Sequence, residues 1–77
     1  MELAEFITNF AAQFDETAPE LIQAETNFRD DLEEWDSLKA LSIIAMVDAE
    51  YSVSIKGTDI RACQTVKDLF DLVSSKK

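Results

Sequence analysis

A serine, Ser37, follows a run of carboxylates in the middle of the chain. Five of the seven residues from Asp30 to Asp36 are acidic, and Leu38 comes directly after the serine. Because apolar residues recur at helical spacing from here on, we expect Ser37 at a helix N-terminus. The unpaired N–H groups and the positive dipole end at such a position favour a phosphate. The carboxylates oppose that phosphate but attract a basic enzyme that would install it.

Two plainer interpretations apply to the same residues. Ser37 could be only a helix cap, which stabilises a helix by about 1 kcal/mol. Asp36 is also a capping residue type, and a cap at Asp36 would leave the Ser37 hydroxyl free for modification. The acids of residues 30–34 could instead bind calcium, but they lack the alternating ligand spacing and the turn glycine of a calcium loop.

The chain has few groups for catalysis of its own. It contains no histidine, and Cys63 is its single cysteine. These counts exclude a Ser–His–Asp triad, a Cys–His pair, a histidine metal site and an internal disulfide. We expect Cys63 to be a small buried apolar residue on the short third helix, since its only cationic neighbour in sequence is Arg61. A single domain of residues 1–77 leaves little room for a walled active site, so we expect no enzymatic activity.

Charge and hydropathy restrict the partners. The net charge is −9, with eleven acids and one base in residues 1–38 and five acids and six bases in residues 39–77. This acidity disfavours nucleic acid and favours basic partner surfaces, although it could also serve only solubility. An apolar content of 47% predicts a packed core. No apolar run approaches the ~20 residues of a membrane span, so we expect a cytoplasmic monomer without membrane insertion.

Helical periodicity dominates the N-terminal part of the chain. One helical face is formed by apolar residues at i, i+3, i+4, i+7 and i+11, namely Leu3, Phe6, Ile7, Phe10 and Phe14. Pro19 follows soon after, so the first helix should end near Asp15 or Glu16.

The next segment, residues 17–36, is predicted to be a long connection. It should contain one short turn, around Leu21 and Ile22, and its apolar anchors should be Phe28 and Leu32. A connection of this length in a small domain is usually functional or packed upon itself.

A second helix is predicted from Asp36–Ser37 to about Tyr51. Its core-facing stripe comprises Ala40, Ile43, Ile44, Val47 and Tyr51. A second apolar strip, rotated away from the first, comprises Leu38, Leu41 and Ala45. Such a helix can bury one strip and present the other to a partner, although a wide apolar face in a small bundle would bury both.

The remaining segments predict two more helices after a break at residues 52–57. Thr58 could cap a short helix over residues 59–62, Thr65 should cap the last helix, and residues 74–77 should form a frayed tail. The break should be a buried extended segment with Val53 and Ile55 pointing inward, and the apolar face of the last helix comprises Val66, Leu69, Phe70 and Val73. The predicted fold is therefore all-α, a small four-helix bundle with three longer helices and one short helix.

The chain resembles the acyl carrier protein family. That family attaches 4′-phosphopantetheine to the serine of an Asp-Ser-Leu motif that begins its second helix, and here the motif is Asp36-Ser37-Leu38. The resemblance runs without gaps from Asp36 through Val73. Its supporting segments are Phe28-x-x-Asp31-Leu32, Asp48-Ala-Glu50-Tyr51, Val53-x-Ile55 and Thr65-Val66-x-Asp68-Leu69. The motif is weak alone but specific together with the length, charge and helix spacing, and it implies a bundle of acyl-carrier type.

The resemblance implies a function for this motif. A phosphopantetheinyl transferase would join the Ser37 oxygen to the phosphopantetheine portion of coenzyme A, and the distal thiol would carry an acyl or aminoacyl group as a thioester. Asp36 would help the transferase recognise the site, and Leu38 would flank the arm. The other partners implied are acyl-loading and acyl-using enzymes with basic docking surfaces. Leu38, Leu41 and Ala45 match family positions that contact partner enzymes or line the way to the acyl pocket. The residues that we expect to contact partners are Trp35, Lys39, Leu41, Ala45 and Asp48.

The chain departs from the family pattern at several positions. Trp35 replaces a common glycine, and its ring could stack on a partner, shield the loop or pack on Phe28. Lys39 and Ser42 stand where fatty-acid-synthesis carriers usually have acids, and Lys56 replaces a usual proline. These departures make a dedicated pathway, such as polyketide-like, aminoacyl or cell-surface-modifying chemistry, at least as well supported as ordinary fatty acid synthesis.

A second function stays open beside the carrier protein. The chain could be an unmodified carrier-like helical module that only binds a partner protein. The intact Asp36-Ser37-Leu38 motif favours the carrier, whereas Trp35 and Lys39 leave room for the interaction module.

Overall fold

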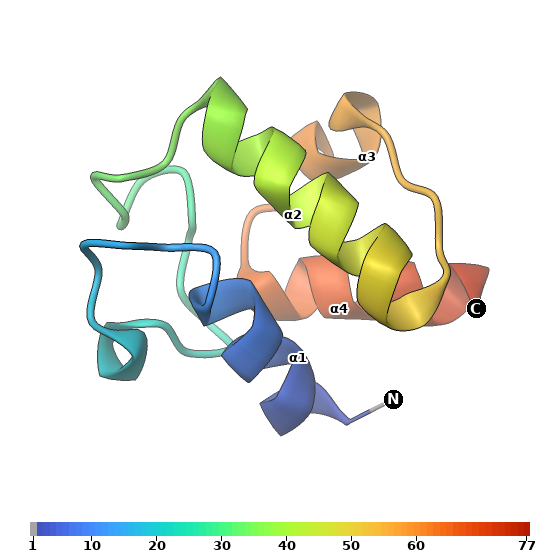
Figure 1. Ribbon diagram of the computed structural model, residues 1–77, viewed down its shortest axis with the longest axis horizontal. Helices are drawn as coiled ribbons and strands as arrows, with labels where there is room; N and C mark the ends of the chain where they lie inside the picture. The colour runs from blue at the N-terminus through green and yellow to red at the C-terminus, as the bar shows by residue number, and fades with distance from the viewer. Residues whose placement is uncertain (1) are drawn as a thin grey trace.

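The computed structural model describes residues 2–77, which form four α-helices and one 3₁₀ turn (Figure 1). In chain order these are α1 Leu3–Ala11, the 3₁₀ turn Pro19–Leu21, α2 Ser37–Tyr51, α3 Gly57–Arg61 and α4 Val66–Lys76. Within residues 2–77 there is no β-strand, and the only bridge pair is isolated. The predicted all-α bundle with three longer helices and one short helix is confirmed. No helix in this part of the chain is long and apolar enough to span a membrane.

The helices share one apolar interior. Helix α1 contacts α4 and α2, and α2 also contacts α3. Side chains from every helix and from the connections between them fill this interior, and those fully buried are Phe6, Phe10, Phe28, Ile22, Ile43, Leu69, Val47, Val66 and Val73. The break before α3 contributes Val53 and Ile55, both buried as predicted. Burial of these side chains is the main favourable contribution to folding.

Helix α1 is shorter than predicted, because it ends at Ala11 and not near Asp15 or Glu16. After Ala11 the chain tightens into i→i+3 hydrogen bonds, one of which runs from Phe14 N to the Ala11 oxygen at 3.0 Å. This turn places the Phe14 ring 5.4 Å from the ring of Phe10. Packing of Phe14 against the core therefore ends α1 earlier than the position of Pro19 predicted.

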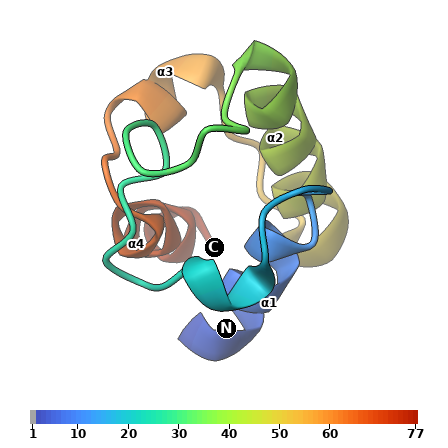
Figure 2. The same cartoon turned by 90° about the vertical axis from the view of Figure 1, so that its left-hand side faces the viewer.

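The connection from residue 12 to residue 36 packs against the rest of the fold. Figure 2 shows it at the end of the fold that faces the viewer, where it runs from α1 past α4 and α3 to the start of α2. Its predicted turn lies at Pro19–Leu21, and its predicted anchors Phe28 and Leu32 are buried. The backbone of Lys67 donates to the Ala24 oxygen at 2.9 Å, so the connection is also bonded to the start of α4.

Helix α2 has the predicted limits, Ser37–Tyr51. Its buried residues are Ile43, Met46, Val47 and Tyr51, while Ala40 and Ile44 are only partly buried. Met46 was not among the predicted core residues. The helix ends at Tyr51, because the left-handed backbone of the next residue, Ser52 (φ 57°), stops the helical hydrogen-bond pattern.

The boundaries of the last two helices differ from the prediction. Helix α3 begins at Gly57, before the predicted cap Thr58, because the Asp59 carboxylate accepts from the backbone N–H of Lys56 at 2.9 Å. Helix α4 is capped by Thr65 as predicted, but it continues to Lys76 instead of fraying from residue 74. Burial of Val73 in the last turns explains this continuation.

Candidate functional site

Ser37 is the first residue of α2, and its side chain is exposed. The helix cap is supplied by the preceding residue, because Asp36 Oδ1 accepts from the Lys39 backbone N–H at 2.8 Å. In the part of the chain that the structure describes, the Ser37 hydroxyl forms no side-chain hydrogen bond. Of the two capping residues that the sequence allowed, the structure selects Asp36, which leaves the serine oxygen accessible and uncommitted.

The electrostatic surroundings of Ser37 combine opposing effects. The N-terminus of α2 supplies the positive end of a helix dipole beside the hydroxyl. Asp36 and the neighbouring Glu33 are exposed, so their carboxylates surround the site with negative charge. The helix N-terminus is therefore compatible with an anion beside Ser37, while the exposed carboxylates make the surrounding surface acidic.

Glu34 organises the loop before α2, which the sequence did not predict. Its carboxylate accepts from the Asp15 backbone N–H at 2.9 Å, from the Glu16 backbone N–H at 3.0 Å and from the Thr17 hydroxyl at 2.9 Å. It also pairs with Lys39 Nζ at 3.2 Å. One carboxylate therefore joins the turn after α1 to the first turn of α2.

Glu34 should make the stability of the fold dependent on acid pH. Desolvation raises its pKa, but hydrogen bonds from Asp15, Glu16, Thr17 and Lys39 outweigh it and lower the pKa from 4.5 to about 2. A folded-state pKa below the unfolded value stabilises the fold above the unfolded pKa, and this stabilisation is lost as pH falls through the folded pKa. The contribution of Glu34 should therefore disappear between about pH 4.5 and about pH 2.

We expect Glu34→Gln to lower the melting temperature at pH 7. The further fall in melting temperature from pH 4.5 to pH 2 should be smaller in this variant than in the wild-type protein. The neutral amide keeps the size of the side chain but replaces a carboxylate oxygen with a donor that cannot accept from the loop N–H groups. Thermal unfolding followed by circular dichroism across this pH range measures the effect. Glu33→Gln is the matched control, because Glu33 is exposed and its carboxylate bonds none of these groups. Identical pH profiles for the two variants would contradict the assignment.

Lys39, predicted to contact partners, is instead held inside the chain. Its Nζ donates to the Gln13 backbone oxygen at 2.8 Å, pairs with Glu34 and lies 5.4 Å from the centre of the Phe14 ring. Only 15% of the side chain is exposed. Because its ammonium group is held by groups of the same chain, we do not propose Lys39 as a residue that contacts partners.

Trp35 packs on the core aromatic rings. Its ring centre lies 4.6 Å from that of Phe28 and 6.4 Å from those of Phe10 and Phe14, and it is nearly parallel to Phe10. The side chain is partly buried. Of the alternatives that the sequence left open, packing on Phe28 is the one observed, and it fixes the backbone immediately before Asp36 and Ser37.

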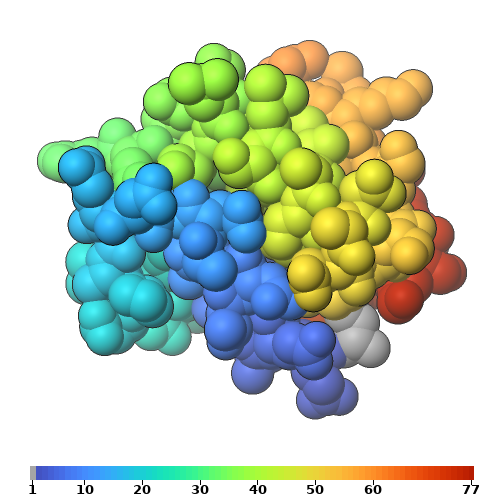
Figure 3. Space-filling view, viewed as in Figure 1, coloured from blue at the N-terminus to red at the C-terminus, as the bar shows by residue number. Residues whose placement is uncertain are grey.

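The second apolar strip of α2 faces outward. Leu38 is 71% exposed and Leu41 is 60% exposed, and Ala45 and Asp48 on the same helix are also exposed. The alternative that this strip belongs to the core is therefore wrong. In Figure 3 the residues of α2 form an uncovered band across the visible face, from green to yellow.

A hollow of about 310 Å³ opens beside Ser37, between the start of α2 and α3. Its apolar wall includes Trp35, Ala40 and Ile60. Two arginines that were not among the predicted site residues, Arg29 and Arg61, also line it. Their positions could not be read from sequence spacing, because the connection and α3 meet only in the folded chain.

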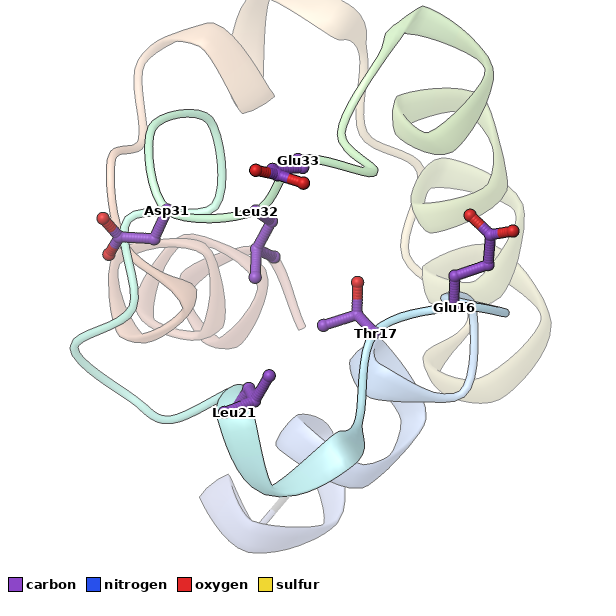
Figure 4. A pocket seen from close by; sticks show the side chains of 6 residues that line it. All are labelled: Glu16, Thr17, Leu21, Asp31, Leu32 and Glu33. Carbon is purple, nitrogen blue, oxygen red and sulfur yellow. The ribbon is translucent and has the colours of Figure 1, made fainter.

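A second hollow, of about 420 Å³, lies within the connection from residue 12 to residue 36 (Figure 4). Its rim is acidic, with Glu16, Asp31 and Glu33, and its apolar lining comes from Leu21 and Leu32. None of its lining residues belongs to the predicted site.

Cys63 is buried, as predicted, although it follows α3 instead of lying on it. Burial raises the pKa of its thiol, the carboxylates of Asp68 and Asp59 raise it further, and Arg29 only partly opposes them. A thiol with a raised pKa carries little thiolate and is a poor nucleophile.

Comparison with known protein families identifies the class. The family described as "Phosphopantetheine attachment site" matches residues 5–73, which is nearly the whole chain. The chain belongs to this family, whose members carry 4′-phosphopantetheine covalently and are non-catalytic carriers. No curated protein matches the sequence. The exposed, uncommitted hydroxyl of Ser37 fits the attachment of such an arm.

Proposed function

We propose that this chain, as a single domain of residues 1–77, carries an acyl or aminoacyl group as a thioester on a 4′-phosphopantetheine arm attached to Ser37. The observation that carries the proposal is the free, exposed hydroxyl at the first position of α2, within the segment that matches the attachment-site family. The absence of histidine and the inert Cys63 support a role as a substrate of other enzymes.

The attachment is a transfer of the phosphopantetheine group from coenzyme A to the oxygen of Ser37. The Ser37 oxygen attacks the pyrophosphate phosphorus next to the pantetheine portion, and a new P–O bond forms. The pyrophosphate P–O bond breaks, and adenosine 3′,5′-bisphosphate leaves. The hydroxyl proton passes to a base of the transferase. Asp36 contributes by capping the helix itself, which keeps the oxygen available.

The docking surface that we propose consists of Leu38, Leu41, Ala45 and Asp48 on the outer face of α2. Exposed leucines provide apolar area, and Asp48 with the acids before Ser37 provides charge for basic partner surfaces. The partners are a phosphopantetheinyl transferase and the enzymes that load and use the cargo. A neutral Ser42 and the internal Lys39 leave this face less acidic than that of a fatty-acid-synthesis carrier, which supports a dedicated acyl or aminoacyl pathway.

The proposed function is tested by intact mass. The purified apo protein is incubated with coenzyme A, magnesium and a broad-specificity phosphopantetheinyl transferase, and its peptides are then mapped. A gain of one phosphopantetheine, located on Ser37, supports the proposal. No gain under conditions that modify a control carrier would overturn it and favour the unmodified helical interaction module.

We expect Leu38→Ser to lower kcat/KM of the transferase about 10-fold, because burying a leucine in an interface contributes about 1.5 kcal/mol. Stability should not change, since the side chain is 71% exposed in the free protein. Initial rates of arm attachment measure the effect. Leu21→Ser is the matched control, because Leu21 is 65% exposed but lies in the 3₁₀ turn. Equal rates for both variants would show that the transferase does not use this part of α2.

A further inference from the structure

The hollow beside Ser37 brings positive charge to a strongly acidic part of the molecule. Arg29 and Arg61 both line it together with Ser37 and Asp36. Residues 1–38 hold eleven acids and Arg29 alone as a base, so a phosphate attached to Ser37 would stand among like charges. Whether a cation is free to offset that repulsion depends on what each nearby basic side chain already binds.

Two of the basic side chains near the start of α2, Arg29 and Lys39, are committed to other groups. The Arg29 guanidinium donates to the Ile60 oxygen at 2.9 Å and to the Cys63 oxygen, and it lies 5.2 Å from the centre of the Phe28 ring. It therefore joins the connection to the end of α3. Lys39 is held by Glu34 and the Gln13 oxygen.

Arg61 is a further cation, and its guanidinium is available. It is exposed and lies in the last turn of α3, and among residues 2–77 it forms no ion pair. Its Nη1 lies 3.5 Å from the point where a Cβ on Gly57 would stand, so the side chain extends back along α3 over Gly57. Gly57 also lines the hollow, and this places the guanidinium on the side of α3 that opens toward Ser37.

We propose that Arg61 binds the phosphodiester that joins the arm to Ser37. This inference rests on the proposed attachment at Ser37. A phosphate bonded to the serine oxygen has to lie beside the mouth of the hollow, whose other polar lining is the carboxylate of Asp36 and the committed Arg29. A guanidinium there forms charge-assisted hydrogen bonds to phosphate oxygens and offsets the repulsion from neighbouring carboxylates. Arg61 thus fixes the start of the arm and directs it along the apolar wall formed by Trp35 and Ile60.

The test compares apo and holo protein, with attachment at Ser37 first established by mass. In the wild-type protein, conversion to the holo form should shift the side-chain Nε–Hε resonance of Arg61 but not that of Arg29. This shift should shrink at high salt, because the pair is exposed and screened. In Arg61→Gln the ³¹P resonance of the phosphodiester should move, and the melting temperature of the holo form should fall by about 2–4 °C relative to its apo form. Arg61→Lys should give an intermediate result.

Lys76→Gln is the matched control, because it removes the same charge from an exposed position at the far end of α4. Comparable behaviour of Arg61→Gln and Lys76→Gln in both measurements would overturn the role of Arg61 while leaving the carrier function intact. A wild-type protein that gains no arm would overturn the proposed function, and the role of Arg61 with it. Circular dichroism of each apo variant verifies that the exposed substitutions leave the fold unchanged.

Discussion

Replacing Ser37 with alanine is expected to abolish attachment of phosphopantetheine completely while changing the free energy of unfolding by less than about 0.5 kcal/mol. The loss is complete because the hydroxyl oxygen itself forms the bond to phosphorus. Stability is preserved because the Ser37 side chain is exposed and Asp36, not Ser37, caps α2. Intact mass after incubation with transferase and coenzyme A measures attachment, and urea unfolding measures stability.

Two variants separate attachment from capping. Ser42→Ala removes another hydroxyl from the same helix, one that donates to the Leu38 oxygen, and should still gain the arm. Asp36→Ala should retain the hydroxyl of Ser37 but lose about 1 kcal/mol of stability through the missing cap. A mass gain in Ser37→Ala would place the arm on another residue. A large destabilisation of Ser37→Ala would show that Ser37, and not Asp36, holds the end of the helix.

Replacing Trp35 with alanine is expected to destabilise the fold by about 3 kcal/mol. The indole packs on three phenylalanine rings, and its removal leaves a cavity where the loop before α2 meets the core. In a domain of this size that loss is a large part of the total stability. Urea unfolding followed by far-UV circular dichroism measures it, because the only tryptophan, and its fluorescence, is removed.

The matched control for Trp35→Ala is Leu38→Ala. Leu38 is also a large apolar residue beside Ser37, but it is 71% exposed, so its truncation should change stability by less than about 0.5 kcal/mol. A loss below about 1 kcal/mol for Trp35→Ala would contradict the packing described for the indole. Such a result would favour the alternative that Trp35 contacts a partner protein.

The sequence by itself determined the features that depend on local interactions. Apolar spacing predicted the all-α bundle and the limits of α2, since helical periodicity depends on residues three and four apart. The capping of α4 by Thr65 was predicted because the cap bonds a backbone group three residues away. Ser37 was singled out for the same reason, because a motif and the helix it begins are both contiguous in the chain.

Only the tertiary structure decided how those elements meet. The contacts of the Glu34 carboxylate with the turn after α1 and the internal position of Lys39 both depend on partners more than ten residues away. The sequence left Trp35 open between core and surface, and the aromatic rings around it settled the choice. The same applies to Arg29 and Arg61, which reach the hollow beside Ser37 through the packing of the connection and α3. Such contacts leave no periodic signal, because the distance between partners along the chain is arbitrary and the packing of the whole fold selects them.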